Sequence, residues 1–261
     1  MRNSELSVNK KAHYYRVLIC LIACFSCGIL DAYTLFFKGF FGMLQTGNLV
    51  NSMFYLVNGQ FEFLLVYIPV TLSFLFGLFV SNIIETKCDK KVIHSPTILT
   101  FLAIIILLII ICIPSSFEVS NGNVDFHKLD WQNILADCLF AVLGAFLFKS
   151  YSRLDAAHFT STMMTANLAR MVNSIYLGIV KKDKLERQKA LDYIAIIFCF
   201  LVGVATFTLF YKFSFMENYS ESILGNYFPN MILLLPFLLI LIILSLTYLI
   251  AVEERKNRKL L

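Results

Sequence analysis

Long apolar runs, separated by short polar stretches, dominate the pattern of this chain. Six of the runs approach 20 residues, the length with which an α-helix crosses the ~30 Å hydrocarbon core of a bilayer. They predict spanning helices over six ranges: 17–37, 62–84, 97–114, 132–149, 190–211 and 230–252. The alternating strands of an outer-membrane barrel are absent from the pattern. The sequence therefore predicts an all-α integral membrane protein.

Two shorter and more polar segments, 42–59 and 160–180, either cross the membrane or re-enter and leave it on the same side. Positive charge separates the two models, because Lys and Arg concentrate on the cytoplasmic side. If both segments re-enter, both termini are cytoplasmic, and of the 22 Lys and Arg residues only Lys38, Lys128 and Lys212 lie outside. If both segments span, Arg170 lies within the membrane and five more basic residues move outside: Lys87, Lys90, Lys91, Lys149 and Arg153. Charge favours six spans plus two re-entrant or broken helical segments.

A four-residue phrase occurs once in each polar segment, as Thr46-Gly47-Asn48-Leu49 and as Thr165-Ala166-Asn167-Leu168, 119 residues apart. With three spans in each half, the second copy must be upside down relative to the first. We therefore expect an inverted 3+3 repeat. Its parts are a cytoplasmic N-terminal segment (1–16), a first membrane repeat (17–114), an external loop (115–131), a second membrane repeat (132–252) and a basic cytoplasmic tail (253–261).

The polar phrases are candidates for a binding site, because inverted repeats with interrupted helices are the plan of many secondary transporters. Each phrase is expected to begin a half-helix whose free N–H groups and positive dipole end point into the membrane. Polar residues at helical spacing then form one stripe per segment: Gln45, Asn48, Ser52 and Tyr55 in the first, and Thr162, Thr165, Arg170 and Asn173 in the second. The alternative is that Thr-x-Asn only caps a helix start.

Ionisable residues within the spans add further candidates, since charge in hydrocarbon is costly. Asp31 either couples transport to a proton or cation, binds a substrate amine, or forms a structural pair with Lys38. Asp137 is expected at the outer interface. Arg170 binds an anionic substrate, pairs with Asp31, or extends to the cytoplasmic interface. The predicted substrate- or ion-binding residues are Asp31, Gln45, Thr46, Asn48, Thr162, Thr165, Asn167 and Arg170.

Glycines and prolines mark the expected hinges and close approaches. Gly39 and Gly42 permit irregular backbone between the first span and the first polar segment. Pro69 and Pro236 lie within the second and sixth spans and are expected to kink them. The full set of such positions is Gly28, Gly39, Gly42, Gly47, Pro69 and Pro236.

Composition excludes several function classes. The net charge of +5 comes from Lys and Arg between the spans, so it does not indicate nucleic-acid binding. Cys20, Cys24 and Cys27 share one helical face and are expected to pack as small apolar residues. Neither the cysteines nor the histidines have zinc-ligand spacing, so we expect no metal and no cofactor. The chain lacks phosphate-loop, Ser-His-Asp and H-E-x-x-H motifs, and we expect no enzymatic activity.

Two signatures resemble those of the YoaK family of bacterial membrane proteins, whose function is unknown. The first is Gly28-Ile29-Leu30-Asp31-Ala32-Tyr33 followed by Gln45-Thr46-Gly47-Asn48-Leu49-Val50. The second runs from Phe148 to Arg153 and from Thr160 to Arg170, with Ala166 where the family usually has Gly. The resemblance implies about six spans and a bacterial inner membrane, and it implies no activity.

The leading hypothesis is a small-molecule secondary transporter of the bacterial inner membrane. Its expected partners are the lipid bilayer, a small-molecule substrate, and a coupling proton or cation. The alternative is a non-transporting membrane protein: a sensor, a scaffold or a partner subunit. A weaker alternative is a lipid-modifying enzyme that uses Asp31, Asp155 and His158.

Overall fold

The computed structural model describes residues 2–91, 95–113, 118–120, 123–125, 130–151, 164–212 and 228–258. Within these residues the fold is helical apart from one small hairpin. The long helices are α1 (Arg2–Lys38), α3 (Phe61–Lys91), α4 (Ser95–Cys112), α5 (Trp131–Tyr151), α7 (Lys184–Phe210) and α10 (Leu234–Arg258). The short helices are α2 (Gln45–Val57), α6 (Met164–Val180) and α9 (Phe228–Met231). Strands β1 (Glu118–Ser120) and β2 (Asn123–Asp125) pair antiparallel.

Six helices are long and apolar enough to cross a membrane, and each matches one predicted span. The helices extend beyond most of the predicted ranges, above all α1, which begins at Arg2. The β1–β2 hairpin within the 115–131 loop was not predicted. Strands of three residues carry too little periodicity to be recognised in a sequence.

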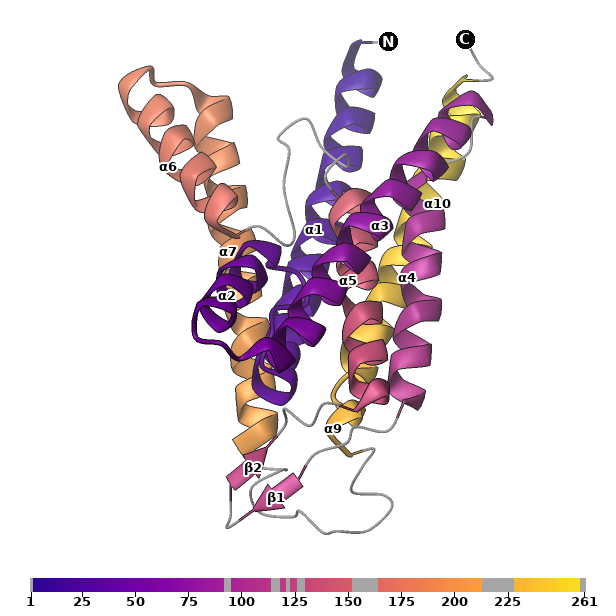
Figure 1. Cartoon of the computed structure of the whole chain (residues 1–261). Coiled ribbons are helices and arrows are strands. Elements are labelled where there is room, and N and C mark those ends of the chain that lie inside the picture. The colour runs from indigo at the N-terminus through magenta and orange to yellow at the C-terminus, as the bar shows by residue number, and fades with distance from the viewer. Residues whose placement is uncertain are drawn as a thin grey trace.

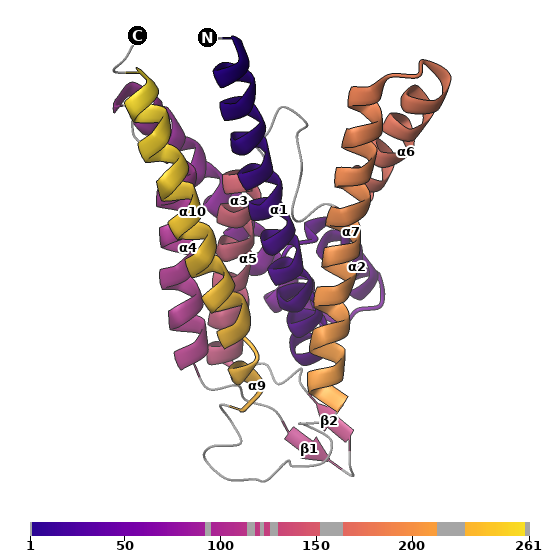
Figure 2. The same ribbon diagram turned by 180° about the vertical axis from the view of Figure 1, so that it is seen from behind.

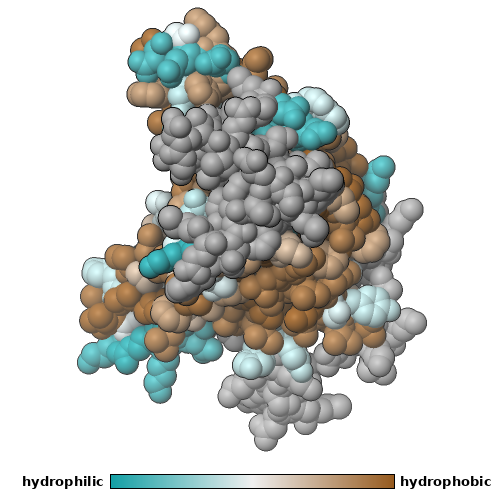
Figure 3. Space-filling model, turned by 90° about the horizontal axis from the view of Figure 1, so that it is seen from below, coloured by the Kyte–Doolittle hydropathy of each residue, from teal (hydrophilic) through white to brown (hydrophobic). Residues whose placement is uncertain are grey.

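Apolar side chains on the outer surface identify the lipid-facing sides of the helices. Along α3, large exposed residues follow one side of the helix at spacings of three or four positions, with Leu75 and Phe76 adjacent: Phe61, Leu65, Ile68, Leu72, Leu75, Phe76 and Phe79. A water-soluble protein rarely exposes such a continuous stripe. Much of the coloured surface seen from the hairpin end is likewise hydrophobic (Figure 3). The surface therefore agrees with a bundle whose solvent is hydrocarbon.

The two chain ends lie at one end of the bundle, and the hairpin lies at the other (Figure 1). Helix α1 runs towards the hairpin end and α3 runs back, so α2, between them, leaves and returns on one side. In the same way α5 runs towards the end with the termini and α7 runs away from it, with α6 between them (Figure 2). Neither short helix is among the six candidate spans. This arrangement agrees with two re-entrant segments.

Two pairs of long helices pack most extensively: α1 against α7, and α3 against α5. Each pair crosses at a glycine. A Cβ on Gly203 would collide with the carbonyl oxygen of Phe25 across the α1–α7 interface, and one on Gly28 would collide with that of Phe200. A Cβ on Gly77 would lie 2.7 Å from the Cβ of Ala145 across the α3–α5 interface. The missing side chains let the backbones approach closely, as small residues do between membrane helices.

The span predicted over 230–252 is broken just before Pro236. Helix α9 ends at Met231 and α10 begins at Leu234, so the helix is interrupted at Ile232 and Leu233. Pro236 has no N–H to donate to the carbonyl of Ile232, four residues earlier, which is where a proline breaks a helix. Pro69 does lie inside α3, as expected.

Candidate functional site

The connection between α1 and α2 is an irregular turn held by side chains. Gly39 has φ of 69°, a left-handed conformation that favours glycine. The Tyr67 hydroxyl, from α3, donates to the Gly39 carbonyl at 3.0 Å. The turn is thus fixed from a neighbouring helix.

Asn48 closes this turn from α2. Its Oδ1 accepts from the Phe41 N–H at 3.0 Å, and its Nδ2 donates to the Phe41 carbonyl at 2.7 Å. Nδ2 also donates to Gln45 Oε1 at 3.1 Å, and Gln45 Nε2 donates to the Gly42 carbonyl at 3.1 Å. Asn48 is fully buried. Its amide therefore replaces the backbone partners that Phe41 lacks in this irregular stretch.

Asp31 anchors the other side of the turn. Its Oδ1 accepts from the Met43 N–H at 3.1 Å. One turn further along α1, Thr34 Oγ1 accepts from the Gly42 N–H at 3.0 Å. Two successive amides of the turn thus donate to side chains of α1. Gly42 approaches α5 as well, since a Cβ on Gly144 would lie 3.1 Å from its carbonyl oxygen.

The second oxygen of Asp31 is buried and has no hydrogen-bond partner among the described residues. Asp31 is 5% exposed. A buried polar atom without a partner is costly, so such atoms need an explanation in function or in a missing partner. Oδ2 can accept a proton, a cation or a donor group from a ligand.

The predicted structural pair between Asp31 and Lys38 is wrong. Lys38 Nζ donates to Asn133 Oδ1 of α5 at 2.7 Å. The ammonium group also interacts electrostatically with the carboxylate of Asp137, one turn further along α5. The seven-residue spacing does place Asp31 and Lys38 on one face of α1, but α5 supplies the closer partners.

Asp137 lies near the start of α5, where we expected it, but it is buried within the protein. It is 4% exposed, and its Oδ1 has no hydrogen-bond partner among the described residues. Lys38, Asn133 and Asp137 together form a buried polar cluster where α1 ends and α5 begins. The sequence signal that identifies it is the pair Asn133 and Asp137, spaced by one helical turn at the start of a span.

In the second copy of the phrase, Asn167 is fully buried, like Asn48. The inward face of α6 carries Asn167, Ser174 and Gly178. Thr165 and Asn173, which we expected on this face, are exposed. The predicted stripe was therefore placed on the wrong side of α6, while Thr162 lies outside the described residues.

The remaining predicted residues are dispersed. Thr46 is exposed on α2, and Gly47 lies against the ring of Phe41. Arg170 is half-buried and makes neither a hydrogen bond nor an ion pair with Asp31, so of the three alternatives for Arg170 the pairing with Asp31 does not form. The structure gathers Asp31, Gln45 and Asn48 around one turn and does not bring Thr46 or Thr165 to it.

Two further polar contacts were missed. The Tyr33 hydroxyl donates to Asn230 Oδ1, and Asn230 Nδ2 donates to the Ile113 carbonyl at 2.7 Å. Asn230 thus joins α1 to the end of α4 through α9. Lys149 of α5 forms a 3.2 Å ion pair with Glu85 of α3. Arg153, Asp155 and His158, considered above, lie outside the described residues.

None of the seven cysteines forms a disulfide, and Cys20 and Cys24 pack in an apolar cluster with Tyr193 and Ile196 of α7. Within the described ranges, no group of three or more His, Cys, Asp or Glu side chains gathers where it would hold a metal ion. The chemistry that the described site offers is that of a buried carboxylate beside an irregular turn.

Comparison with known proteins gives a family. Residues 19–246, most of the chain, match the family model described as "Protein of unknown function (DUF1275)". The comparisons with curated proteins and with solved structures find no match. With its six apolar helices, the chain is a multi-span helical membrane protein, and it belongs to the DUF1275 family.

Proposed function

We propose that this protein is a small secondary transporter in which Asp31 binds the coupling proton or cation, or an amine of the substrate. The carrying observation is the buried Oδ2 of Asp31, which has no hydrogen-bond partner among the described residues. Intramembrane carboxylates commonly mark ion or substrate pathways. The irregular turn beside Asp31 gives the backbone a place to rearrange when a ligand binds.

Most of the helix packing supports an inverted repeat, the plan of many secondary transporters. We match α1 with α5, α2 with α6, α3 with α7, and α4 with α10. If each helix is replaced by its match, a packed pair should become another packed pair. The α1–α7 pair becomes α5–α3, the α2–α3 pair becomes α6–α7, and the α4–α5 pair becomes α10–α1. All six of these pairs pack together. The α4–α10 and α1–α5 pairs, which this replacement leaves unchanged, also pack. The exception is the small α3–α4 contact, whose counterpart α7–α10 is not among the packed pairs of the described residues.

The buried faces of α2 and α6 support the same repeat. Asn48 and Asn167 are both fully buried, and each lies in the first turn of its helix. Counted by the same offset, Gly178 at the end of α6 matches Gly59 after α2. The glycines of the two main crossings, Gly77 and Gly203, also occupy matching helices.

We propose a cytoplasmic location for both termini and a bacterial inner membrane for the protein. The positive-inside rule supports the orientation, because Lys and Arg crowd the end of the bundle with the termini. The resemblance to the YoaK family supports the membrane. A reporter domain fused after Lys91 should be cytoplasmic, and an external reporter would contradict the orientation.

The transport proposal is tested with an Asp31→Asn variant. Asn keeps an acceptor for the Met43 N–H, so the turn remains anchored while the ionisable group is lost. Metabolites in cells and medium are compared among a deletion strain and strains that express the wild type, Asp31→Asn or Thr46→Ala. We expect one metabolite whose distribution between cells and medium differs from that of the deletion strain when the wild type or Thr46→Ala is expressed. Expression of Asp31→Asn should leave this metabolite distributed as in the deletion strain, although the variant protein is present in the membrane at normal abundance. Wild-type behaviour of Asp31→Asn would refute the role of Asp31.

A non-transporting sensor, scaffold or partner subunit is the second candidate. It is favoured by the polar phrases themselves, because Asn48 is satisfied within its own turn while Thr46 and Thr165 are exposed. In this case no metabolite would differ between the deletion strain and the complemented strain. A protein partner would instead be recovered after cross-linking in the wild type and lost in a Thr46→Trp variant.

A further inference from the structure

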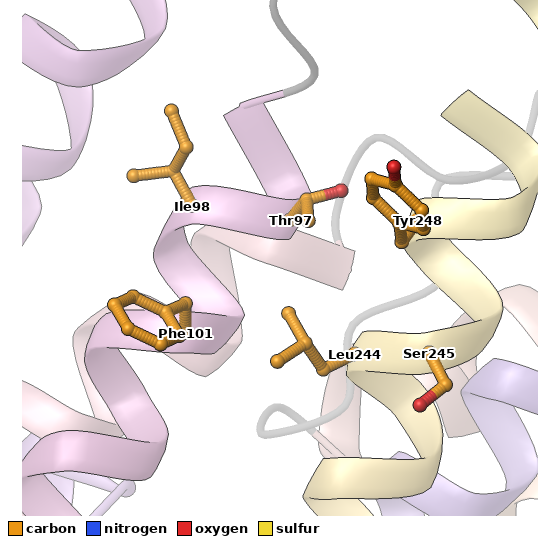
Figure 4. A pocket seen from close by; sticks show the side chains of 6 residues that line it. All are labelled: Thr97, Ile98, Phe101, Leu244, Ser245 and Tyr248. Atoms are coloured by element: carbon orange, nitrogen blue, oxygen red, sulfur yellow. The ribbon is translucent and has the colours of Figure 1, made fainter. Parts of the chain in front are cut away.

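A groove with a volume of about 450 Å³ lies between α4 and α10. Figure 4 shows its two walls: Thr97, Ile98 and Phe101 come from α4, and Leu244, Ser245 and Tyr248 come from α10. The volume falls within the ~300–1,000 Å³ typical of ligand sites. Neither wall includes a residue of the turn around Asp31, so this site is separate from the one considered above.

The groove faces the membrane. Both walls belong to candidate spans, and the neighbouring outer surface is apolar, with exposed Ile105 and Leu108 on α4 and exposed Leu249 on α10. Phe101 and Tyr248 are themselves 52% and 59% exposed. In a bilayer, molecules reach this opening from the lipid phase, and its natural occupant is a lipid.

The polarity of the groove changes with depth. Thr97 is two residues from the start of its span and Tyr248 is four residues from the end of its span, which places them about 3 and 6 Å inside. Phe101 and Leu244 lie about 9 and 12 Å inside by the same count. The hydroxyl groups of Thr97 and Tyr248 thus lie at the shallow end, beside Ile98, where a phospholipid carries its esters. The deep end holds Phe101 and Leu244, where a phospholipid carries acyl chains, together with the hydroxyl of Ser245, which is bonded within its own helix.

The charge beyond the shallow end selects the headgroup. Helix α10 continues past its span with Arg255, Lys256 and Arg258, and Arg255 follows Tyr248 by two helical turns. Lys87, in the last turns of α3, is exposed at the same end of the bundle. Basic residues just beyond a span attract anionic headgroups by about 1 kcal/mol each.

We propose that this groove is a binding site for one anionic phospholipid. An acyl chain packs between Phe101 and Leu244, an ester oxygen accepts a hydrogen bond from the Tyr248 hydroxyl, and the phosphate lies towards the basic end of α10. The Ser245 hydroxyl donates to the Leu241 carbonyl at 3.1 Å within its own helix. Ser245 is therefore a wall residue that does not hold the lipid.

The test uses full-length protein in nanodiscs that contain equal amounts of phosphatidylglycerol and phosphatidylcholine with the same acyl chains. Native mass spectrometry measures which lipid remains bound after the protein is released. We expect one retained phosphatidylglycerol on the wild type. Ser245→Trp fills the groove with an indole and should lower retention roughly tenfold, which corresponds to about 1.4 kcal/mol.

Leu249→Trp is the matched control, because it adds the same indole to α10 at an exposed position outside the groove. It should retain lipid as the wild type does. Arg255→Gln with Lys256→Gln should abolish the preference for phosphatidylglycerol without emptying the groove. If Ser245→Trp lowers the thermal stability of the protein, Tyr248→Ala, which opens the shallow end, replaces it in the comparison.

Three results would overturn the proposal. Equal retention by the wild type and the groove variants would show that the lipid binds elsewhere. Equal retention of the two lipids by the wild type would show that the site does not select anionic headgroups. A change in the mass of an oligomer on Ser245→Trp would show that the groove is a contact between copies of the chain.

Discussion

Asn48→Ala tests whether the duplicated phrase stabilises the fold. The substitution removes the partners of the Phe41 N–H and carbonyl, at 3.0 and 2.7 Å, and a third bond to Gln45 at 3.1 Å. A partly buried backbone group left without a partner costs about 1–3 kcal/mol, so the two groups of Phe41 should cost about 2–6 kcal/mol together. At about 2–4 °C per kcal/mol for a chain of this size, the apparent Tm should fall by roughly 4–24 °C.

The assay is thermal unfolding of the purified protein in detergent, followed by intrinsic fluorescence. Thr46→Ala is the control, because Thr46 belongs to the same phrase but is exposed, and its loss should change stability by less than about 0.5 kcal/mol. Equal Tm values for Asn48→Ala and the wild type would refute the structural role of Asn48. A low Tm for Thr46→Ala as well would show that the phrase acts through contacts other than those described.

Three further predictions concern packing, strain and charge. Gly203→Ala should destabilise the protein by about 1–3 kcal/mol, because its Cβ would collide with the backbone of α1. The control is Gly59→Ala, whose Cβ would meet no atom within 4 Å and whose only cost comes from its φ of 71°. Denaturation of both variants tests whether Gly203→Ala loses more stability than Gly59→Ala. Lys182→Gly should raise the apparent Tm, since Lys182 has φ of 53° and a left-handed residue costs about 1–2 kcal/mol; an unchanged or lower Tm would contradict the strain. Lys38→Met should destabilise by about 3–5 kcal/mol, and adding Asp137→Leu should restore part of the loss; a double variant less stable than Lys38→Met would show that their charges are not coupled.

The spans were readable from the sequence because each depends on the local number of apolar residues. The same holds for the turn before α2, where Gly39 and Gly42 lie together in an otherwise apolar stretch. Side-chain partners on different helices could not be predicted from the sequence. Lys38 is an example, because the sequence offers Asp31 on the same face of α1, while the actual partner, Asn133, lies on another helix. Only the packing of α1 on α5 decides between them.

The faces of the short helices were partly readable. In α2 the predicted stripe of Gln45, Asn48, Ser52 and Tyr55 is buried or half-buried while Thr46 is exposed, so the spacing gave the correct face. Helix α6 also carries polar residues that face outward, at Thr165 and Asn173, and the spacing alone could not rank them against Asn167. Burial of Asn167 depends on contacts made by the folded bundle, which the local pattern does not contain.

The pairing of α1 with α7 and of α5 with α3 has a consequence for how the protein is made. The first helix of each half of the sequence finds its main partner in the other half. During synthesis α1 therefore enters the membrane long before α7 exists and must wait with its face around Phe25 and Gly28, which α7 later covers, unprotected. The insertion machinery or the lipids have to shield that face until α7 emerges. Two separately expressed halves, divided in the 115–131 loop, would each lack this cover and should accumulate only when produced together.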